Sequence, residues 1–159
     1  MATMTEKRTL VVNPAFLQEI KDSNPDLWQT IHQLRQTCET EDGSAATVRS
    51  LTRLLDTLRD QLSMQFALEE AYGFVEIPVG SSVRMLTDPE HFQKTSLAHD
   101  QHCQLYLRLS ELAEQAEELQ YRGVGIEGFR GLIAAVEAFD ARLRQHEQLE
   151  ADLIASAGN

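Results

Sequence analysis

The sequence predicts an all-α protein, an up-down-up-down antiparallel four-helix bundle that occupies residues 1–159 as a single domain. Two observations support this prediction. The 159 residues include only 8 Gly and 4 Pro, most of them in three short stretches, and the segments between are rich in Leu, Ala, Gln, Glu and Arg, which are strong helix formers. Each segment also repeats apolar residues at alternate spacings of three and four, which is typical of the inward-facing row of a bundle helix.

The turn-forming stretches divide the chain into four helical segments. These stretches are residues 39–44, 74–88 and 121–128. The predicted helices cover about residues 14–38, 45–73, 89–120 and 128–156. Asn13–Pro14 and Asp88–Pro89 each offer a capping side chain followed by a proline suited to the first helical position, and Ser44 is suited to cap the second helix.

Two features interrupt this pattern. Pro25 lies inside the first helical segment, where a proline removes a helical hydrogen bond, so it predicts a kink or a short break there. The connection at residues 74–88 is long for a helical bundle and has room for a short strand at Phe74–Val79.

The charge balance and the cysteine count narrow the function classes. Asp and Glu number 25 against 14 Lys and Arg, a formal net charge of −11. Binding to nucleic acid or to an anionic membrane needs clustered Lys and Arg, so we expect neither kind of partner. The two cysteines form no CxxC motif, and we find neither a signal peptide nor an apolar run long enough for a membrane span. We therefore expect a cytoplasmic protein.

The informative positions are those at which the inward-facing rows become polar. Every predicted helix has such an interruption. At about 1.5 Å of rise per residue, all of them lie about 10–20 Å from the same end of the bundle, so we expect one buried polar layer. Its residues are Asn24 on the first helix, Gln65 and Glu69 on the second, His99 and His102 on the third, and His146 and Glu150 on the fourth.

The chemistry of this layer is that of a metal site. Imidazole and carboxylate groups are the ligands that hold Fe, Mn or Zn inside helical bundles. Two carboxylates, Glu69 and Glu150, buried together without a cation would be strongly destabilising or would take up protons. A bound cation removes that problem. The alternative is a closed, metal-free network of imidazoles, carboxylates and amides.

Four short segments resemble the hemerythrin-like (HHE cation-binding) family. They are QFALEEAYGF at 65–74, LAHDQHCQL at 97–105, RQHEQLEADL at 144–153 and, as a variant of the family's first helix, FLQEIKDSNPDL at 16–27. In that family two non-haem irons lie in the bundle, one held by histidines of the third and fourth helices and the other by histidines of the first and second. Two carboxylates, from the second and fourth helices, bridge the irons.

The resemblance implies a ligand set for this chain. His102 and His146 match the third-helix and fourth-helix histidines, and Glu69 and Glu150 match the bridging carboxylates. His99 is included in the set, although it stands three residues before His102 where the family uses a spacing of four. The implied cofactor is non-haem iron, with Zn or Mn as alternatives and no metal as the remaining one.

The chain departs from the family at Asn24 and Gln65, which stand where the first-helix and second-helix histidines would be. Amides are poor ligands for iron, so the resemblance implies one surviving half-site, with a single metal or a second metal held weakly. We expect the two amides to hydrogen-bond the carboxylates instead. Reversible dioxygen binding as peroxide draws electrons from two irons, so this departure argues against an oxygen-carrier role.

Two hypotheses of function follow. The first is a hemerythrin-like, non-enzymatic protein that binds iron for metal, oxygen or redox sensing or for sequestration, with the metal ion and dioxygen or another small diatomic as partners. The second is a metal-free bundle that acts as an interaction or regulatory module for an unidentified protein. An oxidase or peroxidase role has no residue pattern of its own. Glu70 and Glu147 adjoin the polar layer, and we expect both in solvent.

Overall fold

The structure, a computed structural model, describes residues 8–40, 43–78, 89–123 and 125–157. Over these residues the chain is helical apart from two short strands, which confirms the all-α class and adds a small sheet to it. In chain order the elements are β1 (Arg8–Val12), α1 (Pro14–Asp22), α2 (Pro25–Glu39), α3 (Ala45–Leu68), the π-helical turn η1 (Glu69–Gly73), β2 (Phe74–Pro78), α5 (Pro89–Arg122) and α6 (Ile126–Ala157). None of the described helices combines the length and the apolarity needed to span a membrane.

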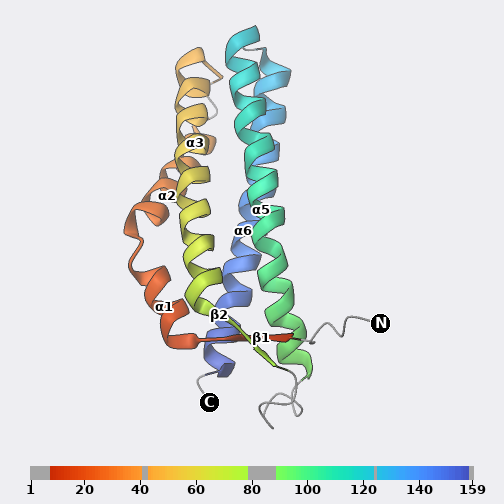
Figure 1. Ribbon diagram of the computed structural model, residues 1–159. Helices are drawn as coiled ribbons and strands as arrows, with labels where there is room; N and C mark the ends of the chain where they lie inside the picture. Colours follow the sequence, from red (N-terminus) through yellow and green to blue (C-terminus); the bar gives the residue numbers. More distant parts are fainter. Residues whose placement is uncertain (1–7, 41–42, 79–88, 124, 158–159) are drawn as a thin grey trace, which may run out of the picture.

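The break predicted at Pro25 is present. α1 ends at Asp22, and Pro25 is the first residue of α2, so the first predicted helix is two helices in the structure. Figure 1 shows α2 continuing in the general direction of α1 after an offset. The second predicted helix, 45–73, consists of α3 followed by η1.

Two of the predicted helix starts are capped as expected. The side chain of Asn13 accepts a hydrogen bond of 3.2 Å from the backbone N–H of Phe16. The hydroxyl of Ser44 accepts one of the same length from the N–H of Thr47. These side chains satisfy N–H groups that lack a partner within the helix. The cap predicted at Asp88 lies outside the described residues.

Helices α2, α3, α5 and α6 lie side by side along the long axis of the molecule (Figure 1). α3 packs against α2 and α5, and α6 packs against α5 and α2. The apolar interior falls into two clusters. The larger is leucine-rich and runs along these four helices. The smaller lies where the strands meet the helices and consists of Val12, Leu17, Phe74, Ala98 and Leu153.

A polar layer separates the two clusters. On α5, His102 stands between Ala98 of the smaller cluster and Leu105 of the larger one. On α6, the stretch from His146 to Glu150 stands between buried leucines of the larger and the smaller cluster. The polar residues of the layer are therefore enclosed by apolar packing on both sides.

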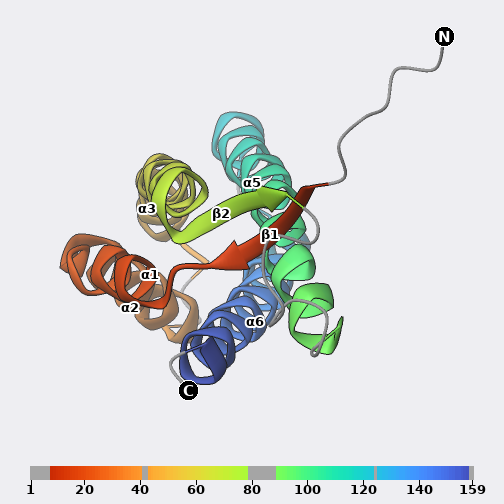
Figure 2. The ribbon, with the colours of Figure 1, turned by 60° about the horizontal axis from the view of Figure 1, so that its bottom comes forward.

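The sheet lies across one end of the helices, as Figure 2 shows. β1 and β2 pair antiparallel, with Val12 opposite Phe74. β2 falls within the stretch Phe74–Val79 considered for a strand, although Val79 itself lies outside the described residues. β1 was not predicted, because an isolated five-residue strand has no local signal beyond a short apolar run.

Gly73 joins the end of η1 to α1. The backbone N–H of Asn13 donates a 2.8 Å hydrogen bond to the carbonyl of Gly73. A Cβ atom at Gly73 would lie only 2.9 Å from Cδ1 of Leu17. The absence of a side chain at this position therefore allows η1 to close against α1, which places the residues of η1 next to those of α1.

Candidate metal centre

Glu69 is brought into the polar layer at the change from α-helical to π-helical geometry. α3 ends at Leu68, and Glu69 is the first residue of η1. A π-helical turn is wider than an α-helical one and is frequent at functional sites. Although it is a carboxylate, the Glu69 side chain is completely buried.

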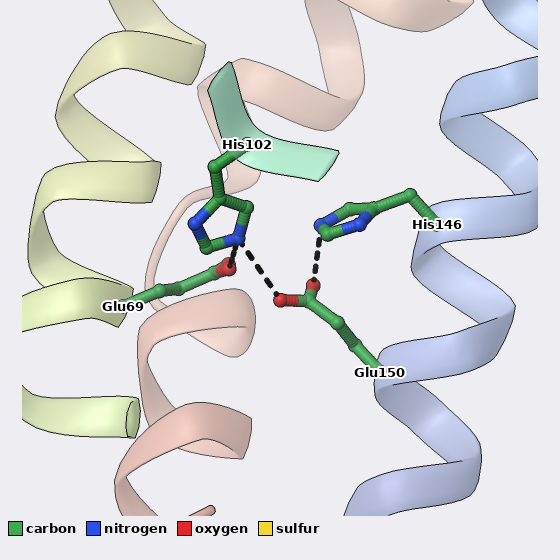
Figure 3. A group of neighbouring side chains, drawn as sticks. All are labelled: Glu69, His102, His146 and Glu150. Atoms are coloured by element: carbon green, nitrogen blue, oxygen red, sulfur yellow. Dashed lines mark hydrogen bonds and ion pairs between the residues drawn. The ribbon is translucent and has the colours of Figure 1, made fainter. Parts of the chain in front are cut away.

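Four buried side chains from three elements meet in this layer. Their ligand atoms all lie within 4.8 Å of one another, and none of the four residues is more than 2% exposed. Atoms bound at 2.0–2.2 Å to one ion lie at most about 4.4 Å apart, so a small contraction brings this group to the geometry of a metal site. The residues, shown in Figure 3, are Glu69 of η1, His102 of α5, and His146 and Glu150 of α6.

The inward nitrogen of each imidazole faces a carboxylate. Nε2 of His102 lies 3.0 Å from Oε1 of Glu69 and 3.4 Å from Oε2 of Glu150. Nε2 of His146 lies 3.3 Å from Oε1 of Glu150. Glu150 is therefore the carboxylate that contacts both imidazoles, as the dashed lines in Figure 3 show.

The outer nitrogen of each imidazole is held by a further side chain. Nδ1 of His146 lies 2.8 Å from Oε1 of Gln101, and Nδ1 of His102 lies 3.4 Å from Oε1 of Glu70. These oxygens can only accept, so each Nδ1 carries the hydrogen. In a neutral imidazole the lone pair is then on Nε2, which points into the cluster. Metal-binding histidines are oriented in this way by the groups around them.

Several polar atoms of the cluster lack a hydrogen bond. Among the residues that the structure describes, Oε1 of Glu69, Nε2 of His146 and Oε1 of Glu150 are buried and make no hydrogen bond of acceptable geometry. Their neighbours are close enough for ion pairing but are poorly aligned for hydrogen bonding. Buried groups of this kind are costly unless something satisfies them. A cation bound at the centre of the cluster would satisfy all three, so the donor set fits a metal ion.

The two amides of the predicted layer connect to Glu69. Nδ2 of Asn24 donates a 2.9 Å hydrogen bond to Oε1 of Gln65, and Nε2 of Gln65 donates a 2.8 Å hydrogen bond to Oε2 of Glu69. Gln65 therefore bonds a carboxylate directly, and Asn24 acts through Gln65. Asn24 is the residue before α2, and its side chain makes no capping hydrogen bond to that helix. Its Nδ2 donates to Gln65 instead.

The fifth residue of the predicted ligand set, His99, lies outside the group of four. Its side chain is 36% exposed, and its Nε2 lies 3.6 Å from Oε1 of Glu70. The reason is the rotation of α5. Its buried face follows Thr95, Ala98, His102, Leu105, Leu109, Leu112 and Ala116. His99 follows Ala98 in the chain and is therefore rotated by about 100° around the helix from this buried face. Its side chain points to the rim of the cluster.

Lys21 is the most important residue that the sequence analysis missed. It lies on α1, is only 8% exposed, and places Nζ 2.8 Å from Oε1 of Glu150. Nζ also contacts Oε2 of Glu147. Glu147 was expected in solvent, but its side chain is only 21% exposed because it pairs with Lys21. Lys21 shares a helix face with Leu17, four residues earlier, which was the available signal, but lysines are seldom buried.

Glu70 and Gln101 also contribute to the centre. Glu70 is partly in solvent as expected, with 44% of its side chain exposed, yet it contacts Nδ1 of His102. Gln101 holds His146. Neither role could be predicted from a heptad pattern, because both residues lie beside the inward-facing rows and reach the imidazoles laterally.

The electrostatics of the layer shift its proton affinities. Burial raises the pKa of Glu69 to about 8, although His102 opposes this shift. Burial lowers the pKa of His102, but Glu150 and Glu69 outweigh that effect and raise it to about 9. Burial also raises the pKa of Glu150, but contacts with His102, His146 and Glu69 outweigh it and hold that pKa well below its usual value. Both raised pKa values favour protonation of the metal-free layer, so a metal bound there would displace protons.

Comparisons of the chain with models of protein families, with curated proteins and with solved structures find no match.

Proposed function

We propose that this protein is a hemerythrin-like metal-binding protein that holds one divalent transition metal, iron first, between Glu69, His102, His146 and Glu150. The observation that carries the proposal is the pair of oriented imidazoles. Both Nδ1 atoms are held by side-chain oxygens, and both Nε2 atoms point at buried carboxylates. The inner nitrogens and the carboxylates therefore face one another around one point, as the ligands of a bound cation do.

The donor set supports the choice of metal. Two imidazole nitrogens and two carboxylates suit Fe(II), Mn(II) and Zn(II), whereas Cu(I) prefers the sulfur ligands that this cluster lacks. The resemblance of the four sequence segments to the hemerythrin-like family favours iron among the three. The contacts of α2, α3, α5 and α6 with one another support the up-down-up-down four-helix bundle that the resemblance implies.

A role in sensing small molecules or in metal sequestration is part of this proposal. A surface groove of about 510 Å³ lies beside the amide pair and is lined by both Asn24 and Gln65. Most of its other walls are apolar: Phe16, Ile20, Met64, Leu68 and Tyr72. A small uncharged molecule such as dioxygen that entered this groove would lie beside Gln65, which is one hydrogen bond away from Glu69. This neighbouring groove is the observation that favours sensing over simple storage.

Metal analysis tests the proposal. Protein purified without chelator and loaded anaerobically with Fe(II) should retain one ion per chain after gel filtration. Glu150→Ala should abolish retention, since Glu150 contacts both imidazoles. Glu137→Ala, the same change at an exposed position of α6, should retain metal as the native protein does. Only trace metal after loading, or unchanged loading of Glu150→Ala, would contradict the proposal.

A specific observation favours the metal-free alternative as well. Lys21 contacts Glu150, and His102, whose raised pKa of about 9 favours its charged form, lies 3.0 Å from Glu69. Both side chains can therefore supply positive charge to the carboxylates from within the protein. In that case the layer would be a structural network in an interaction module. The same loading experiment separates the two functions, because a structural network would neither retain Fe(II) nor gain thermal stability when Fe(II) is added.

A further inference from the structure

We propose that Lys21 is a built-in cation that occupies the place of a second metal and so limits this centre to one metal ion per chain. The inference rests on the proposed metal-binding function. It concerns the part of the layer in which the chain has Asn24 and Gln65 in place of histidines.

Lys21 is positioned as a second cation would be. Its Nζ lies 2.8 Å from Oε1 of Glu150, and Oε2 of the same carboxylate lies 3.4 Å from Nε2 of His102. Oε1 of Glu150 also lies 3.3 Å from Nε2 of His146, so the ammonium group lies against the same carboxylate that contacts both imidazoles. It takes a position on this carboxylate that a second cation would otherwise take.

The ligands left for a second metal are carboxylates that Lys21 already engages. Oε1 of Gln65 accepts a hydrogen bond from Asn24, and the amide nitrogen of Gln65 donates to Glu69, so neither amide is free. Nζ of Lys21 contacts the carboxylates of Glu147 and Glu150. Removal of the ammonium group frees these two carboxylates, and Mn(II) accepts oxygen ligands of this kind.

The charge count of the enclosed groups leads to the same stoichiometry. Three largely buried carboxylates meet here, those of Glu69, Glu147 and Glu150. The single charge of Lys21 and the double charge of one divalent ion balance them when the imidazoles are neutral. A second divalent ion would leave two uncompensated positive charges in a buried site, which is strongly unfavourable. Without Lys21, one divalent ion leaves a net negative charge that attracts another.

Lys21 could instead serve only to join α1 to α6. That role is separable, because joining two helices affects stability but does not set the number of metal ions. The backbone carbonyl of Lys21, which accepts a 3.0 Å hydrogen bond from the indole N–H of Trp28, is kept in any variant. Side-chain substitutions therefore test the ammonium group.

The experiment is an anaerobic Mn(II) titration of the full chain, with bound metal counted after equilibrium dialysis and examined by electron paramagnetic resonance. The native protein should bind one Mn(II). Lys21→Gln should bind two, with a spin-coupled signal, and Lys21→Arg, which keeps the positive charge, should bind one. Lys94→Gln removes a largely exposed lysine and should match the native protein. Circular dichroism checks folding, and Lys21→Met, which keeps the side-chain length, replaces Lys21→Gln if that variant does not fold.

Two failures can be told apart. If neither the native protein nor any variant binds Mn(II) or Fe(II), the proposed function is wrong, and this inference is wrong with it. If the native protein binds one ion and the folded Lys21→Gln or Lys21→Met variant also binds one, metal binding stands and Lys21 does not set the stoichiometry. Two ions bound by the native protein would also overturn the inference.

Discussion

Gln101 and His146 form a 2.8 Å contact between Oε1 and Nδ1, on neighbouring helices α5 and α6. The contact holds the imidazole with Nε2 directed at Glu150. His146 itself is completely buried, so no water competes for its outer nitrogen.

Gln101→Ala should therefore weaken metal binding while leaving the ligands intact. Removing a group that orients a metal-binding histidine typically costs about 10–100-fold in affinity. Competition with a chelator of known affinity measures the change. Gln104→Ala, an exposed glutamine of the same helix, is the matched control. An affinity equal to that of the control would mean that Gln101 does not orient a ligand.

Gln65→Leu should destabilise the protein and loosen Glu69. Gln65 is completely buried and links Asn24 to Glu69 by two hydrogen bonds, so a leucine leaves a buried carboxylate oxygen without its donor. An unsatisfied buried group costs about 1–3 kcal/mol. Denaturant unfolding of the metal-free variant measures the loss. A free energy of unfolding equal to the native value would show that these hydrogen bonds contribute nothing.

Metal affinity should rise with pH. In the metal-free protein the pKa of His102 is about 9 and that of Glu69 about 8, so a metal displaces two protons below pH 8 and one between pH 8 and 9. The logarithm of the affinity should rise by about two per pH unit below pH 8 and level off above pH 9. Zn(II) titrations at several pH values in a non-coordinating buffer test this slope. A pH-independent affinity would mean that the ligands are already deprotonated.

The stability of the metal-free protein should show the opposite trend. The folded pKa of His102 is raised from 6.5 to about 9, so its contribution is fully present below pH 6.5 and is lost as the pH rises through 9. The pKa of Glu69 is raised from 4.5 to about 8, so its contribution to stability is fully present below pH 4.5 and is lost as the pH rises through 8. Through His102 alone the free energy of unfolding should fall by roughly 3 kcal/mol between pH 6 and 9.5, and Glu69 adds to this fall below pH 8. Urea unfolding measures the change, and His102→Gln should remove the His102 part of it.

Gly73→Ala should be destabilising because its Cβ would lie 2.9 Å from Cδ1 of Leu17. Overpacking of this kind typically costs about 1–3 kcal/mol. Gly131→Ala is the matched control, because it lies in α6 with nothing within 4 Å of the added Cβ. That substitution should stabilise the protein by about 0.5–1 kcal/mol. Thermal unfolding of both variants checks the difference in sign.

The helices could be predicted because their signals are local, and so could the burial of four of the five candidate ligand residues in one layer. Caps, the break at Pro25 and the 3–4 repeat of apolar residues act within one or two turns. Glu69, His146 and Glu150 lie on rows that are otherwise apolar, and all three are buried. On α5 the 3–4 spacing of the sequence fits a row through His99 and a row through Ala98 equally well, and the structure buries the row through Ala98. A shift of one residue therefore decides which of the two side chains points into the bundle.

The sequence by itself determined the helical class, the positions of the helices and the chemistry of one polar layer, because periodicity and capping depend on near neighbours in the chain. Only the tertiary structure decided which charges meet in that layer. Lys21 and Glu147 are 126 residues apart and become partners through the packing of α1 against α6. A buried ion pair of this kind depends on how helices dock, and no local pattern reports it. The layer therefore contains a lysine that composition and spacing alone would place in solvent.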